Sequence, residues 1–291
     1  MSRLNEYSRL RHVAVRRPGN AFVDRDKIDA EWQALRFHEA PDFDEANNEF
    51  DSFVQLLSSR GAEISTLPAE SSLTLDSIYP RDSTIIGPKG LILCNMGRAS
   101  RTPEAAVNGK FYASNGHTIA GEIVAPGTLE GGDFIWIDEH HAAVGRGPRT
   151  NDEGIDQLRR LLGKSVELKV VQLPDPAHPD DVLHLMSVIS PLDKDLALVY
   201  RPLVPDDFAQ WLADLGILLI EVPEEEYLPM GCNVLAIAPR QVIMLENLPG
   251  VKAQLTAAGC RVLTYKGVEI SRKGEGGPTC LTRPLIRSDK R

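Results

Sequence analysis

The residue with the clearest chemical potential in this sequence is Cys280. It follows residues 274–279, a run of three glycines, a proline, a glutamate and a threonine. Glycine lets a backbone approach a ligand closely because it has no Cβ, and proline favours a tight turn. An apolar stretch follows, so the sequence predicts a loop that presents the thiol at the start of a strand, where a rigid scaffold can hold a nucleophile. The plainer interpretation is a buried, unreactive cysteine.

Three further reactive side chains end loops earlier in the chain. They are Asp82, Glu130 and His184, and each comes shortly before a predicted β-hairpin. Taken singly, these residues could be a turn cap, a surface charge and a hydrogen-bonded core histidine. Taken together with a thiol, they supply a nucleophile, a proton shuttle and carboxylates that orient and balance charge. Their common place in the loops favours a shared catalytic site.

The elements that would position these side chains recur in a fixed order. Apolar residues at three- and four-residue spacing predict a helix over residues 43–60, and further helices begin near Pro103, Asn151, Pro205 and Pro249. Each helix is followed by a strand, a loop and a β-hairpin. Five copies of one unit predict a pseudo-symmetric ring, because each copy must bury its apolar face against its neighbours.

We expect the N-terminal segment to close this ring. The fifth copy lacks the second strand of its hairpin, and the apolar residues of segment 10–15 could supply it. Equivalent loops of such a ring converge on its axis, which would bring together side chains that are distant in sequence. A two-layer α/β sheet with irregular insertions is the alternative that periodicity leaves open.

The composition is that of an ordinary globular protein, and we expect residues 1–291 to form a single catalytic domain. The chain has 42% hydrophobic and 25% charged residues and a formal net charge of −9, which argues against a nucleic-acid surface. No apolar run approaches the roughly eighteen residues of a membrane span, and residues 1–7 lack the apolar core of a secretory signal. We therefore expect a cytoplasmic protein without a membrane segment. The acidic segment 221–226 is interpreted as a solvated surface.

Neither a metal nor an organic cofactor is expected. His140 and His141 have no cysteine or acidic partner at the spacing of a metal site. The glycines within residues 274–277 neither follow the expected strand nor open a helix, as they would in a nucleotide-binding loop. The four cysteines are widely spaced and form no CxxC pair, which favours reduced thiols.

Six short motifs occur in a characteristic order over most of the chain. In chain order they are residues 79–82 (YPRD), Arg101 followed by Glu104, residues 129–133 (LEGGD), 147–151 (GPRTN), 183–185 (LHL) and 276–282 (GGPTCLT). Together they resemble the guanidino-modifying enzyme superfamily, which includes dimethylarginine dimethylaminohydrolase, arginine deiminase and the amidinotransferases. The resemblance implies a five-bladed α/β propeller of ββαβ repeats, called a pentein, in agreement with the repeats counted above.

The same resemblance implies catalytic roles. The Cys280 thiolate would attack the guanidinium carbon and form a covalent thiouronium intermediate. The positive charge of the substrate would help to lower the pKa of that thiol. His184 would protonate the departing amine and then deprotonate the incoming water, while Glu130 holds the imidazole.

Substrate-binding roles are implied for four further residues. A guanidinium is planar and cationic, so carboxylates can orient it by paired hydrogen bonds. Asp82, together with Asp76, is the candidate for this contact. Arg101 and Arg149 are candidates for binding an α-carboxylate of the substrate; their alternative interpretation is as surface arginines at the start of helices.

The size of the chain favours the dimethylargininase-like branch, whose members convert N-methylated arginine to citrulline and an amine. Two residues depart from the pattern of that branch and leave the substrate open. Arg81 stands where an acidic residue is usual, and Met186 stands where a lysine is common. Arginine deiminase or dihydrolase activity, and transfer of the amidino group to an amine, are therefore kept as alternatives.

A hypothesis from a different class is that the ring is a non-catalytic binding protein. The joint presence of the thiol, the imidazole and the carboxylates argues against it, because a binding protein has no need of such a set. We expect a small guanidino compound as the partner, with no nucleic acid and no membrane. A homodimer is left open.

Overall fold

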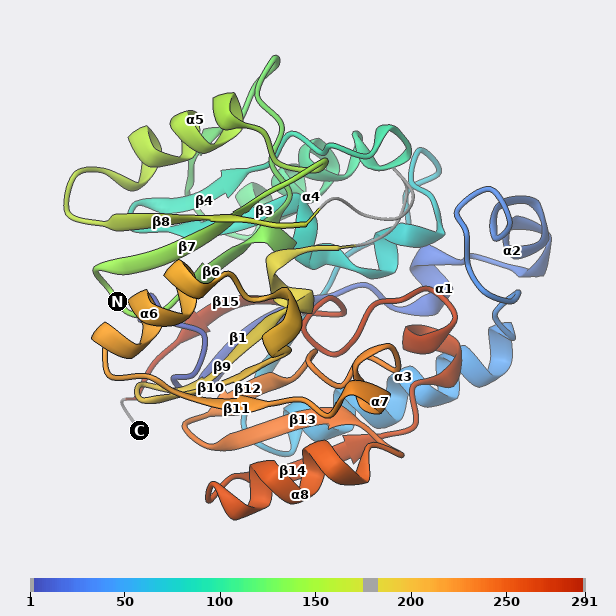
Figure 1. Cartoon of the computed structure of the whole chain (residues 1–291). Coiled ribbons are helices and arrows are strands. Elements are labelled where there is room, and N and C mark those ends of the chain that lie inside the picture. The colour runs from blue at the N-terminus through green and yellow to red at the C-terminus, as the bar shows by residue number, and fades with distance from the viewer. Residues whose placement is uncertain (1–2, 175–182, 290–291) are drawn as a thin grey trace.

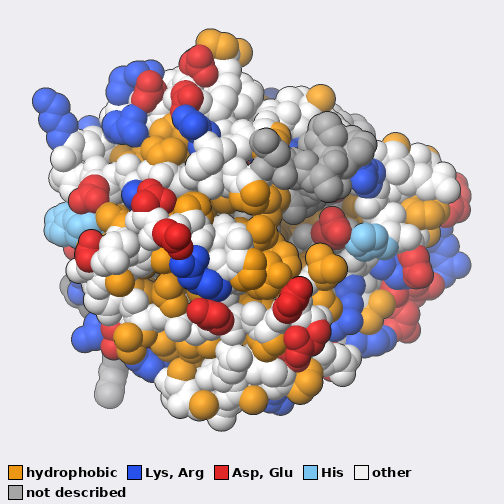
Figure 2. Space-filling model, in the orientation of Figure 1, with side chains coloured by type: hydrophobic (Ala, Val, Ile, Leu, Met, Phe, Trp, Pro, Cys, Tyr) orange, Lys and Arg blue, Asp and Glu red, His pale blue; other side chains and the backbone are white. Residues whose placement is uncertain are grey.

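The computed structural model describes residues 3–174 and 183–289. Within these residues the strands form five three-stranded sheets, as expected for the pentein ring. Figure 1 shows helices α3, α5, α6 and α8 at the periphery of the molecule, outside the sheets. No helix in this part of the chain is both long enough and apolar enough to cross a membrane. Acidic and basic side chains are interspersed on the face drawn in Figure 2.

Four of these sheets are continuous in sequence. In each, the first two strands pair in antiparallel fashion, and the third pairs parallel to the second. The sheets consist of β3 (Thr84–Gly87), β4 (Gly90–Leu93) and β5 (Ile119–Glu122); β6 (Phe134–Trp136), β7 (His141–Arg146) and β8 (Glu167–Gln172); β9 (Ile189–Asp193), β10 (Leu196–Val199) and β11 (Leu218–Glu221); and β12 (Leu235–Ala238), β13 (Gln241–Leu245) and β14 (Arg261–Tyr265).

The remaining sheet joins the two ends of the described chain. Its middle strand, β1 (Leu10–Val15), pairs antiparallel with β15 (Arg283–Arg287) and parallel with β2 (Glu63–Thr66). The expectation that segment 10–15 closes the ring is therefore confirmed. The last strand begins at Arg283, so Cys280 lies in the turn before it and not at its first residue.

A helix precedes the outer strand of every described sheet. These helices are α3 (Phe43–Ser58), α4 (Glu104–Ser114), α5 (Asp152–Leu162), α6 (Asp206–Asp214) and α8 (Pro249–Ala257). Their predicted starting points are correct to within one residue. Helix α5 shows why: Asn151 accepts a hydrogen bond from the Gly154 amide as its N-cap, and the apolar face of the helix is buried at Ile155, Leu158 and Leu162.

Three short helices were not predicted. They are α1 (Pro18–Ala21), α2 (Arg25–Glu31) and α7 (Glu224–Tyr227). The interpretation of segment 221–226 as solvated surface holds for Glu221, Glu224 and Glu225, which are exposed, but is wrong for Glu226, which is only 7% exposed. Its carboxylate accepts hydrogen bonds of 2.7 Å from the amides of Gly250 and Val251 at the start of α8. One carboxylate of the acidic run thus serves as a cap for the next helix.

Candidate active site

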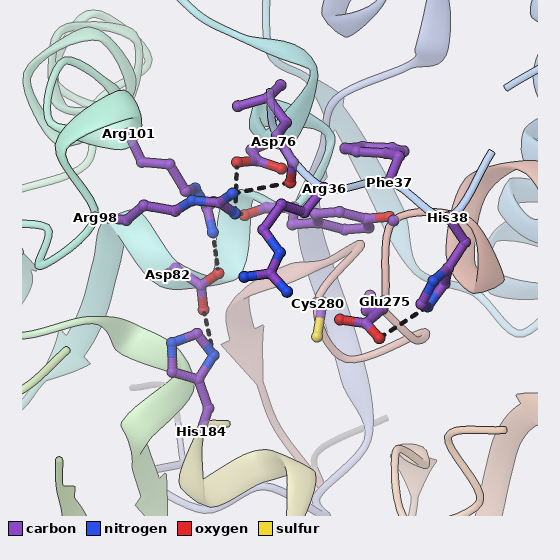
Figure 3. Close-up of a pocket in the computed structure, with 14 residues that line it drawn as sticks. Arg36, Phe37, His38, Asp76, Asp82, Arg98, Arg101, His184, Glu275 and Cys280 are labelled. Carbon is purple, nitrogen blue, oxygen red and sulfur yellow. Dashed lines mark hydrogen bonds and ion pairs between the residues drawn. The ribbon is translucent and has the colours of Figure 1, made fainter. Parts of the chain in front are cut away.

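A pocket of about 400 Å³ brings together loops from several repeats (Figure 3). Five of the seven predicted site residues line it although they come from segments that are far apart in sequence: Asp76, Asp82, Arg101, His184 and Cys280. Tyr79, before β3, also lines the pocket, and the other lining residues come from the loop after α2, from the segment after β4 and from the glycine-rich turn: Leu35, Arg36, Phe37, His38, Arg98, Gly274, Glu275 and Gly276.

Cys280 is the partly exposed cysteine of the chain, whereas Cys94, Cys232 and Cys260 are buried. Burial and the negative charge of Asp82 raise the pKa of the Cys280 thiol to about 11. A hydrogen bond from Asn233 to the sulfur, 3.2 Å long, opposes this shift. In these surroundings the thiol is therefore protonated at neutral pH, and a nearby cation would favour the thiolate.

His184 is buried between two carboxylates. Its Nε2 lies 2.8 Å from a Glu130 oxygen, and its Nδ1 lies 3.8 Å from Asp82 Oδ1. Burial alone would lower the pKa of this imidazole, but the charges of Asp82 and Asp133 and the Glu130 hydrogen bond outweigh it and raise the pKa to about 9. The imidazolium in turn holds the pKa of Glu130 below its usual value against the effect of burial. At neutral pH this site therefore contains an imidazolium that can donate a proton.

Steric crowding explains why two glycines, Gly131 and Gly132, occur in the LEGGD motif. A Cβ on Gly132 would lie 2.5 Å from Asp82 Oδ1 and 2.6 Å from His184 Nδ1. A Cβ on Gly131 would lie 2.4 Å from the Arg81 carbonyl oxygen. Real Cβ atoms do not approach other atoms so closely, so both positions require glycine for the two loops to meet.

Asp133, at the end of that motif, holds the histidine loop in place. Its two oxygens accept hydrogen bonds from the Leu185 amide at 3.0 Å and from the Thr150 hydroxyl at 2.7 Å. Burial raises the pKa of this carboxyl to about 6. The contact with Leu185 explains how the second and third repeats are joined beside His184. Residues 175–182, in the loop before His184, lie outside the described residues.

Both carboxylates predicted to bind a guanidinium are already paired with arginine. Arg101 lies 2.5 Å from Asp82 Oδ2 and also donates to both oxygens of Glu104, at 2.7 and 2.8 Å. Arg98 lies 3.0 Å from Asp76. The two carboxylates thus lie in a setting that binds guanidinium groups, with two of the chain's own arginines around them (Figure 3).

The two arginines predicted to bind a carboxylate are both buried. Arg101 lines the pocket but is held by Asp82 and Glu104 as described above. Arg149 is not among the lining residues, and its Nη1 lies 3.7 Å from Glu130. Their proposed contact with substrate stays a prediction.

The two departures from the family pattern do not line the pocket. Arg81 is 1% exposed, and its Nη2 lies 2.8 Å from a Glu6 oxygen. Met186 is buried in a different small cavity that Glu6 also borders. Both substitutions therefore belong to the packing behind the pocket and not to its substrate-facing wall.

Sequence reasoning missed Asn233, although a signal for it exists. Asn233 lies two residues before β12, just ahead of the hairpin to which no reactive side chain is assigned. It therefore has the same place in its repeat as Asp82, Glu130 and His184 have in theirs. No comparable signal marks Arg36 or Arg98, which lie in segments without a periodic pattern.

The donor atoms of Asp82, Glu130 and His184 lie within 4.8 Å of one another, a distance at which three side chains can hold a metal ion. The Nε2 of His184 already makes its 2.8 Å contact with Glu130, so a metal at that nitrogen would have to break this bond. The expectation of a metal-free reaction stays a prediction.

Known proteins resemble this chain over nearly its whole length. The sequence model of the family described as "N,N dimethylarginine dimethylhydrolase, eukaryotic" matches residues 22–287. The chain belongs to this family. Its membership assigns the protein to the hydrolases that act on carbon–nitrogen bonds of amidines.

Individual relatives agree with this assignment. Uncharacterized protein YkgA of Bacillus subtilis is 34% identical over 245 residues, which cover 84% of this chain and 81% of that protein. N(G),N(G)-dimethylarginine dimethylaminohydrolase of Pseudomonas aeruginosa is 26% identical over 277 residues, covering 94% of this chain and 98% of the enzyme. A structure of a cysteine-to-serine mutant of the latter enzyme, complexed with citrulline, has a TM-score of 0.76 at 24% identity, covering 96% of this chain and 100% of that one. This structural likeness confirms the pentein fold.

Proposed function

We propose that the protein hydrolyses the guanidino group of arginine or an N-methylated arginine to citrulline and an amine, through a covalent intermediate on Cys280. The observation that carries the proposal is the single pocket that contains Cys280, His184, Asp76 and Asp82. Family membership and the relative named dimethylarginine dimethylaminohydrolase support the same reaction.

The first half of the reaction forms the intermediate. The Cys280 thiolate attacks the guanidinium carbon, and a neutral tetrahedral adduct forms. His184, as the imidazolium, gives its proton to the departing nitrogen, and the carbon–nitrogen bond breaks. The amine leaves, a thiouronium cation remains on the sulfur, and His184 is left neutral.

The second half returns the enzyme to its starting state. Neutral His184 takes a proton from water as the oxygen bonds to the thiouronium carbon. The carbon–sulfur bond then breaks, the thiolate leaves, and the protonated ureido group loses a proton to give citrulline. Glu130, 2.8 Å from the imidazole, holds its orientation and stabilises its charged form in both halves.

Substrate binding supplies the charge that Cys280 needs. The thiol has a pKa of about 11 because of burial and the charge of Asp82. A bound guanidinium beside Asp76 and Asp82 would neutralise part of that negative charge and stabilise the thiolate. We therefore assign the two carboxylates to binding the guanidinium of the substrate.

For the opposite end of the substrate we add Arg36 to the candidates Arg101 and Arg149. Arg36 is exposed, lies in the loop after α2 and lines the pocket. Figure 3 shows its side chain projecting into the cavity. A cation at this position would attract the α-carboxylate of an amino acid whose guanidino group reaches Cys280.

The decisive experiment is product analysis by mass spectrometry. The protein, its Cys280→Ser form and a Cys260→Ser control are incubated with arginine, monomethylarginine, dimethylarginine and agmatine. We expect a ureido product from at least one substrate, none with Cys280→Ser, and normal turnover with the control. Turnover that survives in Cys280→Ser would refute the nucleophile, and no product from any substrate would refute the substrate class.

Arginine deiminase activity is the second candidate. Arginine deiminase of Mycobacterium tuberculosis is 30% identical over 72% of this chain, although the match covers only 60% of that enzyme. The same incubation separates the two activities, because ammonia forms from arginine and methylamines form from methylated arginines. Adding glycine as an amine acceptor tests amidino transfer. In that reaction the amidino group bonds to the glycine nitrogen, and a guanidino compound forms in place of citrulline.

A further inference from the structure

Asn233 connects the fourth hairpin, formed by β12 and β13, to the cysteine turn. This residue lies two positions before β12 and is only 7% exposed. The Thr279 amide donates to Asn233 Oδ1 at 3.0 Å, and Asn233 Nδ2 donates to Cys280 Sγ at 3.2 Å. One amide side chain therefore contacts two consecutive residues of the turn that carries the thiol.

The orientation of this amide follows from its partners. A backbone N–H can only donate, so the group that faces Thr279 must be the carbonyl oxygen of Asn233. The NH₂ group must then face the sulfur. The opposite assignment would place two donors against each other at Thr279, which settles the choice between nitrogen and oxygen by hydrogen bonding.

A donor at this position distinguishes the two states of the sulfur. A thiolate accepts a hydrogen bond far better than a thiol does, because the acceptor is charged. The backbone amide of Gly277 is a second donor to the same sulfur. Both donors oppose the burial and the Asp82 charge that favour the neutral thiol.

Packing prevents the amide from moving away. A Cβ on Gly277 would lie 2.5 Å from Asn233 Cγ and 2.6 Å from its Oδ1. The glycine of the GGPTC motif thus leaves just enough space for the asparagine. The side chain is held on one side by this turn and on the other by its own hairpin.

We propose that Asn233 is a positioning residue that fixes the Cys280 sulfur and selectively stabilises its thiolate through the Nδ2 hydrogen bond. This inference rests on the proposed function, since it assigns a role around the same nucleophile. The other ionisable groups that act on the sulfur are Asp82 and Arg81, and the phenols of Tyr79 and Tyr265 are also close enough to interact with it. All four are unchanged in the test below.

The test measures the rate of Cys280 alkylation by iodoacetamide against pH, without substrate, in the wild type, Asn233→Ala and Asn233→Asp. Loss of a hydrogen bond to a charged group predicts that Asn233→Ala raises the pH midpoint of the alkylation rate by about one to two pH units. Asn233→Asp should move it further, because a carboxylate would face the sulfur. Folding of each variant is checked by circular dichroism. Unchanged midpoints in folded variants would overturn the proposal.

A measurement on the unaltered protein covers the case in which the variants do not fold. In ¹⁵N-labelled wild type, the side-chain NH₂ signal of Asn233 should shift with pH together with the titration of Cys280, and this shift should be absent in Cys280→Ser. A signal that does not respond to the titration would contradict the proposal. Neither experiment requires turnover, so failure of the inference remains distinguishable from failure of the proposed reaction.

Discussion

At the scale of single residues, the carboxylates around His184 determine the protonation state of its imidazole. It is buried, yet Asp82, Asp133 and Glu130 raise the pKa of its imidazole to about 9. An imidazole with an ordinary pKa would be mostly neutral at pH 7.5 and a poor donor to a departing amine. The carboxylates around it therefore make the proton available at the pH at which the enzyme is proposed to work.

We predict that Glu130→Gln lowers the pKa of His184 and reduces turnover by roughly 10²- to 10⁴-fold. The amide keeps the size of the side chain but removes the charge that favours the imidazolium. The measurements are kcat against pH and NMR titration of the histidine. A variant with normal kcat across the pH range would show that the Glu130 charge is dispensable.

His184 also predicts a pH dependence of stability. Its pKa of about 9 in the folded protein is above the ordinary histidine value of 6.5. The stabilisation from its charge is therefore fully present below pH 6.5 and is lost as pH rises through 9, an effect of about 3 kcal/mol. Urea unfolding at pH 6 and pH 10 should show that the wild type loses more stability than His184→Gln. Equal losses would contradict the raised pKa.

Arg36 allows a test of how the pocket recognises its substrate. We predict that Arg36→Gln raises KM for arginine roughly tenfold or more, by removal of a charge-assisted hydrogen bond. The effect on agmatine, which has no carboxylate, should be small. Arg25→Gln is the matched control, because Arg25 is exposed on α2 and pairs with Asp44 outside the pocket. Similar losses for arginine and agmatine would rule out carboxylate recognition by Arg36.

At the scale of elements, the short helix α7 supports the longer helix α8. The Glu226 carboxylate receives two amide hydrogen bonds from the first turn of α8, where the positive end of the helix dipole lies. The neighbouring Glu224 and Glu225 are exposed. Three glutamates that look equivalent in sequence therefore differ in function.

We predict that Glu226→Gln lowers the free energy of unfolding by about 1 to 2 kcal/mol, because one strong acceptor and its charge are lost at the helix start. Glu225→Gln, in the same turn, should change it by less than about 0.5 kcal/mol. Chemical denaturation measures both. Equal effects would mean that the capping bonds contribute nothing specific.

The elements also show which parts of the fold could be predicted. Long amphipathic helices such as α3 and α5 have a clear hydrophobic period and strong signals at their ends, and their predicted boundaries lie close to the observed ones. The glutamate of α7 could not be recognised, because its cap partners are distant in sequence and charged runs are usually solvated. The loop after α2 has no period at all, so its position over the pocket follows only from tertiary packing.

The site residues also divide into those that a sequence pattern predicts and those that only tertiary packing places. Asp82, His184 and Cys280 were identified because they occupy one position in a repeated unit, and repetition converts sequence position into spatial proximity. Asn233 obeys the same rule, but its side chain carries no reactive group that would mark it in the sequence. Arg98 beside Asp76 depends on side-chain direction, which no pattern of residue types encodes.

For the whole molecule, closure of the ring depends on β1. This strand is the middle member of its sheet, with β15 on one side and β2 on the other. We predict that Val13→Pro lowers stability by about 3 kcal/mol or more, because proline removes a backbone donor and is poorly tolerated in a central strand. Glu63→Ala, at an exposed position of the edge strand β2, is the control. A thermal midpoint unchanged by Val13→Pro would show that the stability of the ring does not depend on the pairing of β1 with β15 and β2.

The pairing of β1 with β15 also affects how the chain is made. During synthesis β1 leaves the ribosome among the first strands, but its antiparallel partner appears only after the other four sheets. Cys280, in the turn before β15, is made at the same late stage. Nascent chains therefore have an open ring and lack the proposed nucleophile for most of their synthesis. The proposed nucleophile and the strand that completes the fold are made together, so a prematurely terminated product would lack both.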